Sequence, residues 1–266
     1  WAEVIWCEWM LGNSLWYSKH KYKHQKLIFR MHRQELATNY ADNIDFSKVD
    51  LVITVSALFF ERLLERFPNI PRKKVRLIPN YIDADAYKKE WHPDRLFNLA
   101  MIGILPSRKN FHISLEVLKE LRKKDSRYNL SVYSKRPQEL AWLARNKNEM
   151  AYFDNCEKYI ADNNLSESVE FKGHCDLKEA LSDHKIGFIL SVSESVTDLP
   201  CFESFHLAVA DGFAGGGVSL IKKWAGCEYI FPKEGIVDSA SGLVSMVESL
   251  SDDEEAFKYL SRLGLK

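Results

Sequence analysis

Apolar residues along this chain follow two alternating patterns, and each pattern predicts a different element. Short continuous runs such as DLVITVS (50–56) and IGFILSVS (186–193) are typical of strands buried on both faces of a parallel sheet. Stretches such as ALFFERLLERF (57–67) repeat apolar residues every three or four positions, which predicts helices. The alternation favours an α/β fold, with a mostly parallel sheet covered on both faces.

The same two patterns extend over most of the remaining chain, without an internal repeat. They predict further strands at 75–80, 97–105, 128–134, 169–173 and 218–221. They predict further helices at 111–125, 138–164, 176–184, 204–214, 239–250 and 252–263.

One polar segment interrupts the alternation. PNYIDADAYKKEWHPDR (79–95) contains two prolines and carries neither pattern, which is typical of a connection. We therefore predict two α/β domains, 1–80 and 96–266, joined by a linker over 81–95.

The composition is that of a globular protein with a sizeable core. Of the 266 residues, 46% are hydrophobic and 12% are aromatic, which suffices for one large or two medium domains. Lys+Arg and Asp+Glu both number 37, so the formal net charge is zero. A general nucleic-acid-binding protein usually carries a net basic surface, so this balance disfavours that class.

The cysteines and the apolar runs indicate a cytoplasmic protein. Five cysteines are scattered without CxxC spacing: Cys7, Cys156, Cys175, Cys201 and Cys227. This pattern favours reduced thiols over a disulfide framework or a zinc site. No apolar run approaches the roughly 20 residues that span a bilayer, and we expect no signal peptide. Because the chain starts at Trp1 rather than Met, we expect its natural start to lie upstream.

The most informative segment is CFESFHLAVADGFAGGG (201–217), in which two carboxylates flank the start of an apolar helical run. Glu203 precedes the run, Asp211 follows eight positions later, and three glycines close the segment. Ligands in open α/β sheets bind beyond the carboxyl ends of strands, and amides at a helix start attract anions. The amides expected there belong to Ser204, Phe205, His206 and Leu207. With Asp211 about two turns, or roughly 10 Å, into the helix, the segment is suited to a diphosphate ligand.

Five motifs occur in an order that matches one enzyme family. They are VITVSALFFERLLERF (52–67), IPNYIDADAY (78–87), GILPSRKN (103–110), VEFKG (169–173) and ESFHLAVAD (203–211). The last has the form E-x7-E with Asp in place of the second Glu, and the GILPSRKN turn has Ile104 at a position where Arg is usual. Together the motifs resemble those of family-4 GT-B glycosyltransferases, the glycosyl transferases group 1 type.

The resemblance implies a fold and an activity. The fold would be GT-B, with two Rossmann-like parallel-sheet domains, of which the N-terminal one looks truncated because the family's glycine-rich first turn is absent. The activity would be a retaining, metal-independent, hexosyl-type transfer from a nucleotide-diphosphate sugar to a glycan or lipid-linked acceptor. Polysaccharide or glycoconjugate biosynthesis is the expected setting, and the donor is a substrate, so no cofactor is implied.

Two other functions remain open. The chain could be a non-catalytic GT-B subunit that binds a partner enzyme or a glycan, in which case Ile104 and Asp211 would reflect lost activity. It could also be another GT-B enzyme of sugar nucleotides, such as an epimerase, because fold alone does not select a function.

The resemblance also implies roles for individual residues at the donor site. Glu203 would bind hydroxyls of the donor sugar and Asp211 those of the ribose, since carboxylates accept paired hydrogen bonds from diols. Lys109 and Arg108 would bind the diphosphate, with Gly103 opening their turn. The alternatives are an N-cap-like helix charge for Glu203, a solvated helix face for Asp211, and a solvated basic turn for Arg108 and Lys109.

Further candidates lie around the nucleotide base and in the first domain. Phe171, Gly173 and His174 would approach the base. His32, in KLIFRMHRQEL (26–36), matches an N-domain histidine that approaches the sugar and phosphate. A lone histidine is more often structural, and the nearby alternatives are Arg30, Arg33 and Glu35.

Two other segments carry weaker signals. Asp83 and Asp85 form a D-x-D, but they lie in the expected linker, which disfavours a metal site. The basic stretch YSKHKYKHQK (17–26) is either a solvated face or a contact with an anionic membrane surface at the inner face of the membrane.

Overall fold

The computed structural model describes residues 2–194 and 203–265, and the chain divides into two compact units. The first consists mainly of Trp1–Tyr81, together with residues 203–205 and Trp224–Ile230. The second comprises Ile82–Glu194, His206–Lys223 and Phe231–Lys266. Cys201, at the start of the predicted ligand-binding segment, lies outside the described residues.

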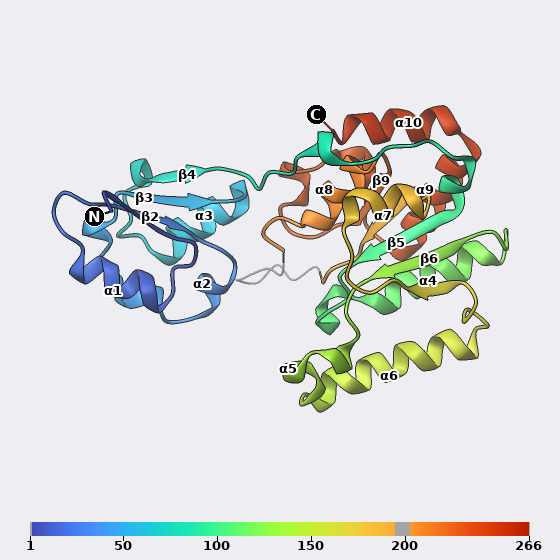
Figure 1. Ribbon diagram of the computed structural model, residues 1–266, viewed down its shortest axis with the longest axis horizontal. Helices are drawn as coiled ribbons and strands as arrows, with labels where there is room; N and C mark the ends of the chain where they lie inside the picture. The colour runs from blue at the N-terminus through green and yellow to red at the C-terminus, as the bar shows by residue number, and fades with distance from the viewer. Residues whose placement is uncertain (1, 195–202, 266) are drawn as a thin grey trace. The chain divides into compact units, whose positions relative to one another are not determined.

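The first unit contains a four-stranded parallel sheet in the order β1-β2-β3-β4 (Figure 1). Its strands are β1 (Val4–Cys7), β2 (Lys26–Arg30), β3 (Leu51–Thr54) and β4 (Val75–Leu77). Its helices are α1 (Gly12–His20), α2 (Gln34–Ala37) and α3 (Ala57–Arg66). Helix α3 begins where the Ser56 hydroxyl accepts the amide of Phe59, and it buries Phe59 and Leu63 one turn apart against the sheet.

The second unit contains a six-stranded parallel sheet in the order β10-β9-β8-β5-β6-β7 (Figure 1). Its strands are β5 (Asn98–Ile102), β6 (Asn129–Tyr133), β7 (Val169–Phe171), β8 (Phe188–Ser191), β9 (Val218–Lys222) and β10 (Ile236–Val237). The chain proceeds outward from β5 to β7, then returns to β8 on the other side of β5. The direction of strand order therefore reverses between β5 and β8.

Helices cover both faces of this second sheet. They are α4 (Phe111–Arg122), α5 (Ala141–Ala144), α6 (Lys147–Asp162), α7 (Leu177–Asp183), α8 (Leu207–Ala214), α9 (Ala240–Asp252) and α10 (Glu254–Leu263). The main core contains side chains of α4, α6, α9 and α10, and a smaller cluster places Leu181 of α7 with Ile189 of β8. β8 is buried along its whole length and β5 at its three central residues, as their continuous apolar runs predict.

Two predicted helices differ from the observed ones. The stretch 138–164 contains two helices, α5 and α6, rather than one. The Asn146 side chain accepts hydrogen bonds from the amides of Asn148 and Glu149 and so caps the start of α6. The helix predicted at 204–214 begins only at Leu207, since the backbone of His206 is extended (φ −86°, ψ 96°). The first-turn amides are therefore not those of Ser204, Phe205 and His206.

The expected linker packs onto the second unit from Ile82 onward. The Lys88 amide donates to the carbonyl of Lys178 in α7 (2.9 Å). The buried Arg95 guanidinium donates to the carbonyls of Glu90 (2.9 Å) and Gly215 (2.7 Å), and burial lowers the pKa of Arg95 to about 10. Residues 82–95 are thus anchored along much of their length rather than forming a free connection.

Two further findings concern the helices and the cysteines. Within residues 2–194 and 203–265, no helix is both long and apolar enough to cross a membrane. The four described cysteines, Cys7, Cys156, Cys175 and Cys227, are free thiols.

Candidate functional site

The reversal of strand order in the second unit places the carboxyl ends of β5 and β8 side by side. Leu99 and Ala100 of β5 pair with Phe188 and Ile189 of β8 in parallel register. The segments that leave these two strands diverge at such a reversal, which is where open α/β sheets bind ligands. The turn after β5 (103–110) and the residues after β8 (192–194) therefore border the candidate site.

Glycines end two of the strands at this edge with unusual backbone angles. Gly103 follows β5 with φ +74°, and Gly173 follows β7 with φ +71°. Both conformations favour glycine because it lacks a Cβ atom. Among the described residues, no heavy atom lies within 4 Å of where either Cβ would be, so a ligand can approach the backbone closely.

The turn after β5 is held from both sides. The amide and the hydroxyl of Ser107 each donate to the Glu149 carboxylate of α6 (2.7 Å each). On the other side, Asn110 donates from its side chain to the Val192 carbonyl (3.1 Å), and the Glu194 amide donates to the Arg108 carbonyl (2.8 Å). The basic residues of this turn therefore lie on a fixed backbone.

Lys109 contacts a buried histidine at the start of α8. Its Nζ lies 3.0 Å from His206 Nε2, and His206 Nδ1 lies 2.8 Å from the Ser191 hydroxyl at the end of β8. A lysine ammonium can only donate, so Nε2 must accept and Nδ1 carries the proton that is donated to Ser191. The three side chains therefore fix the neutral Nδ1–H tautomer of His206 and place the Lys109 charge beside the helix start.

Arg108 projects from the same turn and pairs with a carboxylate from the β8 side. Its Nε lies 2.5 Å from Glu194 Oε2, and about a third of its side chain is exposed. Neither basic residue is a fully solvated turn residue, which was the alternative for this motif. Both cations lie at the sheet edge where the strand order reverses.

Asp211 accepts a hydrogen bond that its sequence position does not suggest. The Tyr87 hydroxyl donates to Asp211 Oδ1 (2.6 Å). Burial raises the pKa of Asp211, and the bond from Tyr87 opposes this shift only in part. The solvated-face alternative for Asp211 is therefore wrong. Since α8 starts at Leu207, Asp211 lies four residues, or about 6 Å, into the helix rather than two turns.

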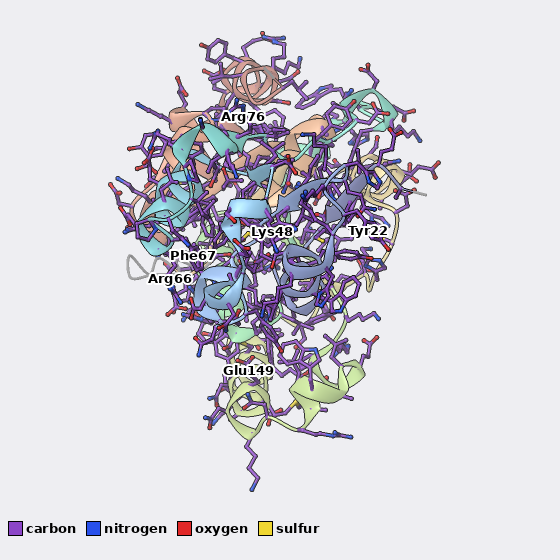
Figure 2. All side chains as sticks on the ribbon, turned by 90° about the vertical axis from the view of Figure 1, so that its left-hand side faces the viewer. Tyr22, Lys48, Arg66, Phe67, Arg76 and Glu149 are labelled. Carbon is purple, nitrogen blue, oxygen red and sulfur yellow. The ribbon has the colours of Figure 1, made fainter. Side chains whose placement is uncertain are left out.

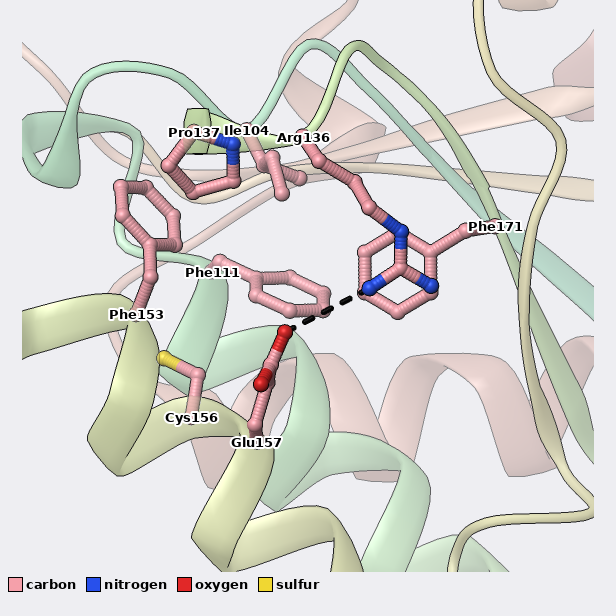
Figure 3. Close-up of a pocket in the computed structure, with 8 residues that line it drawn as sticks. All are labelled: Ile104, Phe111, Arg136, Pro137, Phe153, Cys156, Glu157 and Phe171. Carbon is pink, nitrogen blue, oxygen red and sulfur yellow. Dashed lines mark hydrogen bonds and ion pairs between the residues drawn. The ribbon is translucent and has the colours of Figure 1, made fainter. Parts of the chain in front are cut away.

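Phe171 and Ile104 face an apolar layer (Figure 3). The cavity they line measures about 10 Å³, room for a single water rather than a base. The Arg136 guanidinium lies 4.3 Å from the centre of the Phe171 ring and 3.4 Å from the Glu157 carboxylate. Figure 3 shows the guanidinium over the ring, with a dashed line to Glu157. His174 is exposed, beyond Gly173.

The remaining donor-site candidates precede α8. Glu203 is buried, with 9% of its surface exposed, and Ser204 and Phe205 follow it without helical structure. These three residues group with the first unit, whereas His206 and Asp211 belong to the second.

Comparison with known proteins identifies the architecture. No protein-family model matches the sequence, and no curated protein matches it. HepE from Anabaena, solved with UDP and glucose, superposes with a TM-score of 0.74 at 13% identity, over 98% of this chain and 72% of HepE. The lipopolysaccharide outer core galactosyltransferase WaaB gives 0.67 at 14% identity, over 95% of this chain and 67% of WaaB. The chain has the GT-B glycosyltransferase fold.

A further solved structure has the same architecture, but the match covers a smaller share of that protein's length. The pneumococcal O-GlcNAc transferase GtfA, solved with UDP and GlcNAc, superposes with a TM-score of 0.64 at 18% identity. The match spans 90% of this chain and 48% of GtfA. These structures confirm the predicted GT-B fold class, with parallel sheets of four and six strands.

In the first GT-B unit, His32 is oriented through both its ring and its backbone. Its Nε2 lies 3.0 Å from Glu8 Oε1, and the Trp9 ring stacks on its imidazole with 4.1 Å between centres. Its amide donates to the buried Glu35 carboxylate (3.1 Å). Arg30 also donates to Glu8 (2.9 Å). His32 therefore belongs to a polar cluster at the carboxyl ends of β1 and β2.

The ionisation of Glu8 follows from this cluster. Partial burial works against its charge, but hydrogen bonds from Trp6 and His32 and the charge of Arg30 hold the pKa of Glu8 below its ordinary value. Burial raises the pKa of Glu35, and the amides of Met10 and His32 oppose that shift.

Sequence patterns missed several partners of the candidate residues. They are Glu8, Trp9, Tyr87, Ser191 and Glu194. Most contact the candidates across long stretches of chain, as with the 124 positions between Tyr87 and Asp211. Glu35, whose carboxylate accepts the His32 amide, is the exception, because the sequence already places it among the alternatives near that histidine.

The D-x-D motif lies at a short turn of the second unit. Asp83 and Asp85 flank Ala84 at a 3-10 turn, Ala84–Ala86. In the described part of the chain, no three His, Cys, Asp or Glu side chains are grouped so that they could hold a metal ion.

Proposed function

We propose that this chain transfers a sugar from a nucleotide-diphosphate donor to a glycan or lipid-linked acceptor, with retention and without a metal. The observation that carries the proposal is the pair of cations, Arg108 and Lys109, on a braced turn at the strand-order reversal. The solved structures of HepE and GtfA, which share the fold, contain UDP. Polysaccharide or glycoconjugate biosynthesis is the setting that we propose.

In this proposal the second unit stabilises the diphosphate leaving group. Negative charge grows on the diphosphate as the bond to the sugar breaks, and groups already positioned there lower the barrier. Lys109 supplies a point charge, Arg108 supplies a planar fork of donors, and the first amides of α8 add their dipoles. Ser191 orients His206, and His206 holds the Lys109 ammonium at the helix start. The imidazole itself is neutral in this arrangement, so it adds no second positive charge.

The carboxylates would position the donor. Asp211 would bind the ribose hydroxyls together with Tyr87, whose hydroxyl already donates to Oδ1. Glu203 would accept hydrogen bonds from the donor sugar. Gly103 and Gly173 would allow the nucleotide to lie close to the backbone.

The first unit would contribute His32 to the sugar and the acceptor. Glu8 and Trp9 fix the orientation of its ring, and Glu35 fixes its backbone. In a retaining transfer of this type, an oxygen of the leaving diphosphate accepts the proton of the acceptor hydroxyl. The side chains then orient the reactants and stabilise charge, and no protein nucleophile is needed.

Calorimetric titration with UDP, GDP and their sugar derivatives tests the proposal. We expect one diphosphate to bind, and Lys109→Ala to weaken it about tenfold to a hundredfold because a charge-assisted contact is lost. Glu203→Ala should weaken the sugar nucleotide more than the bare diphosphate. Lys123→Ala is the matched control, since Lys123 pairs with Glu120 on the exposed end of α4.

Two results would contradict the proposal. Failure of every nucleotide to bind at millimolar concentration would remove the donor site. Binding of a sugar nucleotide with no transfer or hydrolysis, in the presence of a broad set of acceptors, would instead indicate a non-catalytic subunit.

A further inference from the structure

The first unit carries a basic hollow at the amino ends of its strands, the sheet edge opposite His32. It measures about 460 Å³, and its lining includes Lys21, Tyr22, Lys23, Lys48, Asp50 and Lys74. These residues come from three separate loops, which precede β2, β3 and β4. Tyr22 and Lys48 are labelled in Figure 2.

Two of the lysines are held by the backbone of the loops around them. Lys21 Nζ donates to the Gln25 carbonyl (2.6 Å) and lies 3.5 Å from Asp50. Lys74 Nζ donates to the Ser47 carbonyl (3.1 Å). These bonds fix the positions of the two ammonium groups before any ligand arrives.

Carboxylates near the hollow do not balance its positive charge. Asp50 pairs with Lys26 (3.2 Å) and Lys21, and Asp45 pairs with Lys48 (3.7 Å). Burial works against the charge of Asp50, but hydrogen bonds from the Leu27 amide and Lys26 hold its pKa below the ordinary value. Five lysines (21, 23, 26, 48 and 74) against two aspartates (45 and 50) leave an excess of three positive charges. The whole chain has a formal charge of zero, so this excess is local.

We propose that this hollow binds a small soluble anion with at least two phosphate groups. Its volume lies within the range of small-molecule sites, roughly 300–1,000 Å³. Lysines from three loops surround a concave space, which suits a compact polyanion better than a flat membrane surface. The exposed Tyr22 at the rim offers a further hydroxyl donor. The site is independent of the donor site, because it lies at the amino edge of another sheet.

The experiment is a calorimetric titration of the full chain with inorganic tripolyphosphate. Because the proposed donor site also attracts phosphates, all proteins carry Lys109→Ala. The test variant adds Lys23→Gln and Lys48→Gln, which removes two exposed charges from the hollow and leaves the loop-bracing Lys21 and Lys74 intact. The matched control adds Lys19→Gln and Lys73→Gln, which removes two exposed charges from the same unit outside the lining.

We expect tripolyphosphate to bind the Lys109→Ala protein with a 1:1 stoichiometry and to raise its melting temperature. The Lys23/Lys48 variant should bind about tenfold or more weakly, and the Lys19/Lys73 control should change affinity less than about twofold. Retained thermal unfolding without ligand verifies that both variants are folded.

Three outcomes would overturn the proposal. The first is no binding of tripolyphosphate to the Lys109→Ala protein. The second is equal weakening in both double variants, which would indicate unspecific attraction to a basic surface. The third is binding to vesicles of anionic phospholipid without binding to tripolyphosphate, which would indicate a membrane contact. None of these outcomes bears on UDP binding by the wild-type chain, so the two proposals fail separately.

Discussion

The ammonium group of Lys109 is positioned by His206, whose ring is in turn positioned by Ser191. The imidazole is buried, so its two hydrogen bonds cannot be replaced by water without local opening. The position of the Lys109 charge therefore depends on His206, which is neutral when its Nε2 accepts the hydrogen bond from the lysine.

Substitutions of His206 should separate stability from ligand binding. His206→Ala removes both bonds, and we expect it to lower the free energy of unfolding by about 1–3 kcal/mol and UDP affinity by about tenfold. His206→Asn places an amide where Nδ1 lies, so it keeps the bond to Ser191 but cannot reach Lys109. It should recover part of the stability without the affinity, as measured by urea denaturation and calorimetry.

This prediction rests on the proposed donor site. If His206→Asn binds UDP as tightly as the wild type, Lys109 does not depend on the histidine for its position.

Glu35 makes a second prediction at the scale of a single residue. Its carboxylate is fully buried, and burial raises its pKa above the ordinary value for glutamate, about 4.3. The folded state therefore binds this proton more tightly than the unfolded chain does. Its contribution to stability is largest at low pH and is lost as the pH rises through the raised pKa.

Glu35→Gln should remove this part of the pH dependence, because glutamine does not titrate. Urea denaturation between pH 4 and 7 should show the wild type losing stability relative to Glu35→Gln as the pH rises. A constant difference between the two proteins across this range would contradict the assignment. Glu65→Gln, at an exposed position of α3, serves as the control.

At the scale of elements, α8 lies unusually close to the sheet. A Cβ atom on Gly212 would lie 2.3 Å from the Ser219 hydroxyl of β9 and 2.4 Å from Ile189 Cγ1 of β8. Both distances are well inside van der Waals contact. The helix that presents His206 and Asp211 therefore requires glycine at its packing face.

We expect Gly212→Ala to lower the free energy of unfolding by about 1–3 kcal/mol, the usual cost of overpacking a core. Gly12→Ala in α1 is the control, since a Cβ there meets no atom within 4 Å among the described residues. Thermal and urea denaturation of both variants would measure the difference. Equal stability of the two would show that α8 can shift away from the sheet.

The sequence predicted those elements whose burial follows a simple pattern. β3, β5 and β8 were visible as apolar runs, and α3 and α4 as amphipathic repeats, because local residues decide them. Helix α1 was missed, since it buries two serines, Ser14 and Ser18, rather than an apolar stripe. The start of α8 was misplaced because no local signal shows that His206 is extended.

The candidate site divides in the same way. Arg108 and Lys109 were predicted from the motif GILPSRKN, and the structure places both on the turn after β5, at the strand-order reversal. The bond between Tyr87 and Asp211 could not be predicted, since their contact depends on how residues 82–95 pack onto the second unit.

At the scale of the whole molecule, the balanced charges have a consequence for solubility. The sequence pI is about 7.2, so net repulsion between molecules is weakest near neutral pH. We expect the solubility of this chain in polyethylene glycol to pass through a minimum near pH 7 and to rise on either side. A monotonic change between pH 5.5 and 9 would contradict this expectation.

The strand-order reversal also constrains the order in which the chain folds. Arg108 and Glu194, which meet beside the reversal, are 86 positions apart, and the paired strands β5 and β8 are separated in the sequence by β6 and β7. Pairing over such separations is slow, because the chain loses the entropy of loop closure before the new contacts stabilise the pair of strands. β5 and β6 are nearer in sequence and can pair first. The cations of the turn and the start of α8 would then come together late in folding. In a partly folded chain, Lys109 would therefore lack its contact with His206.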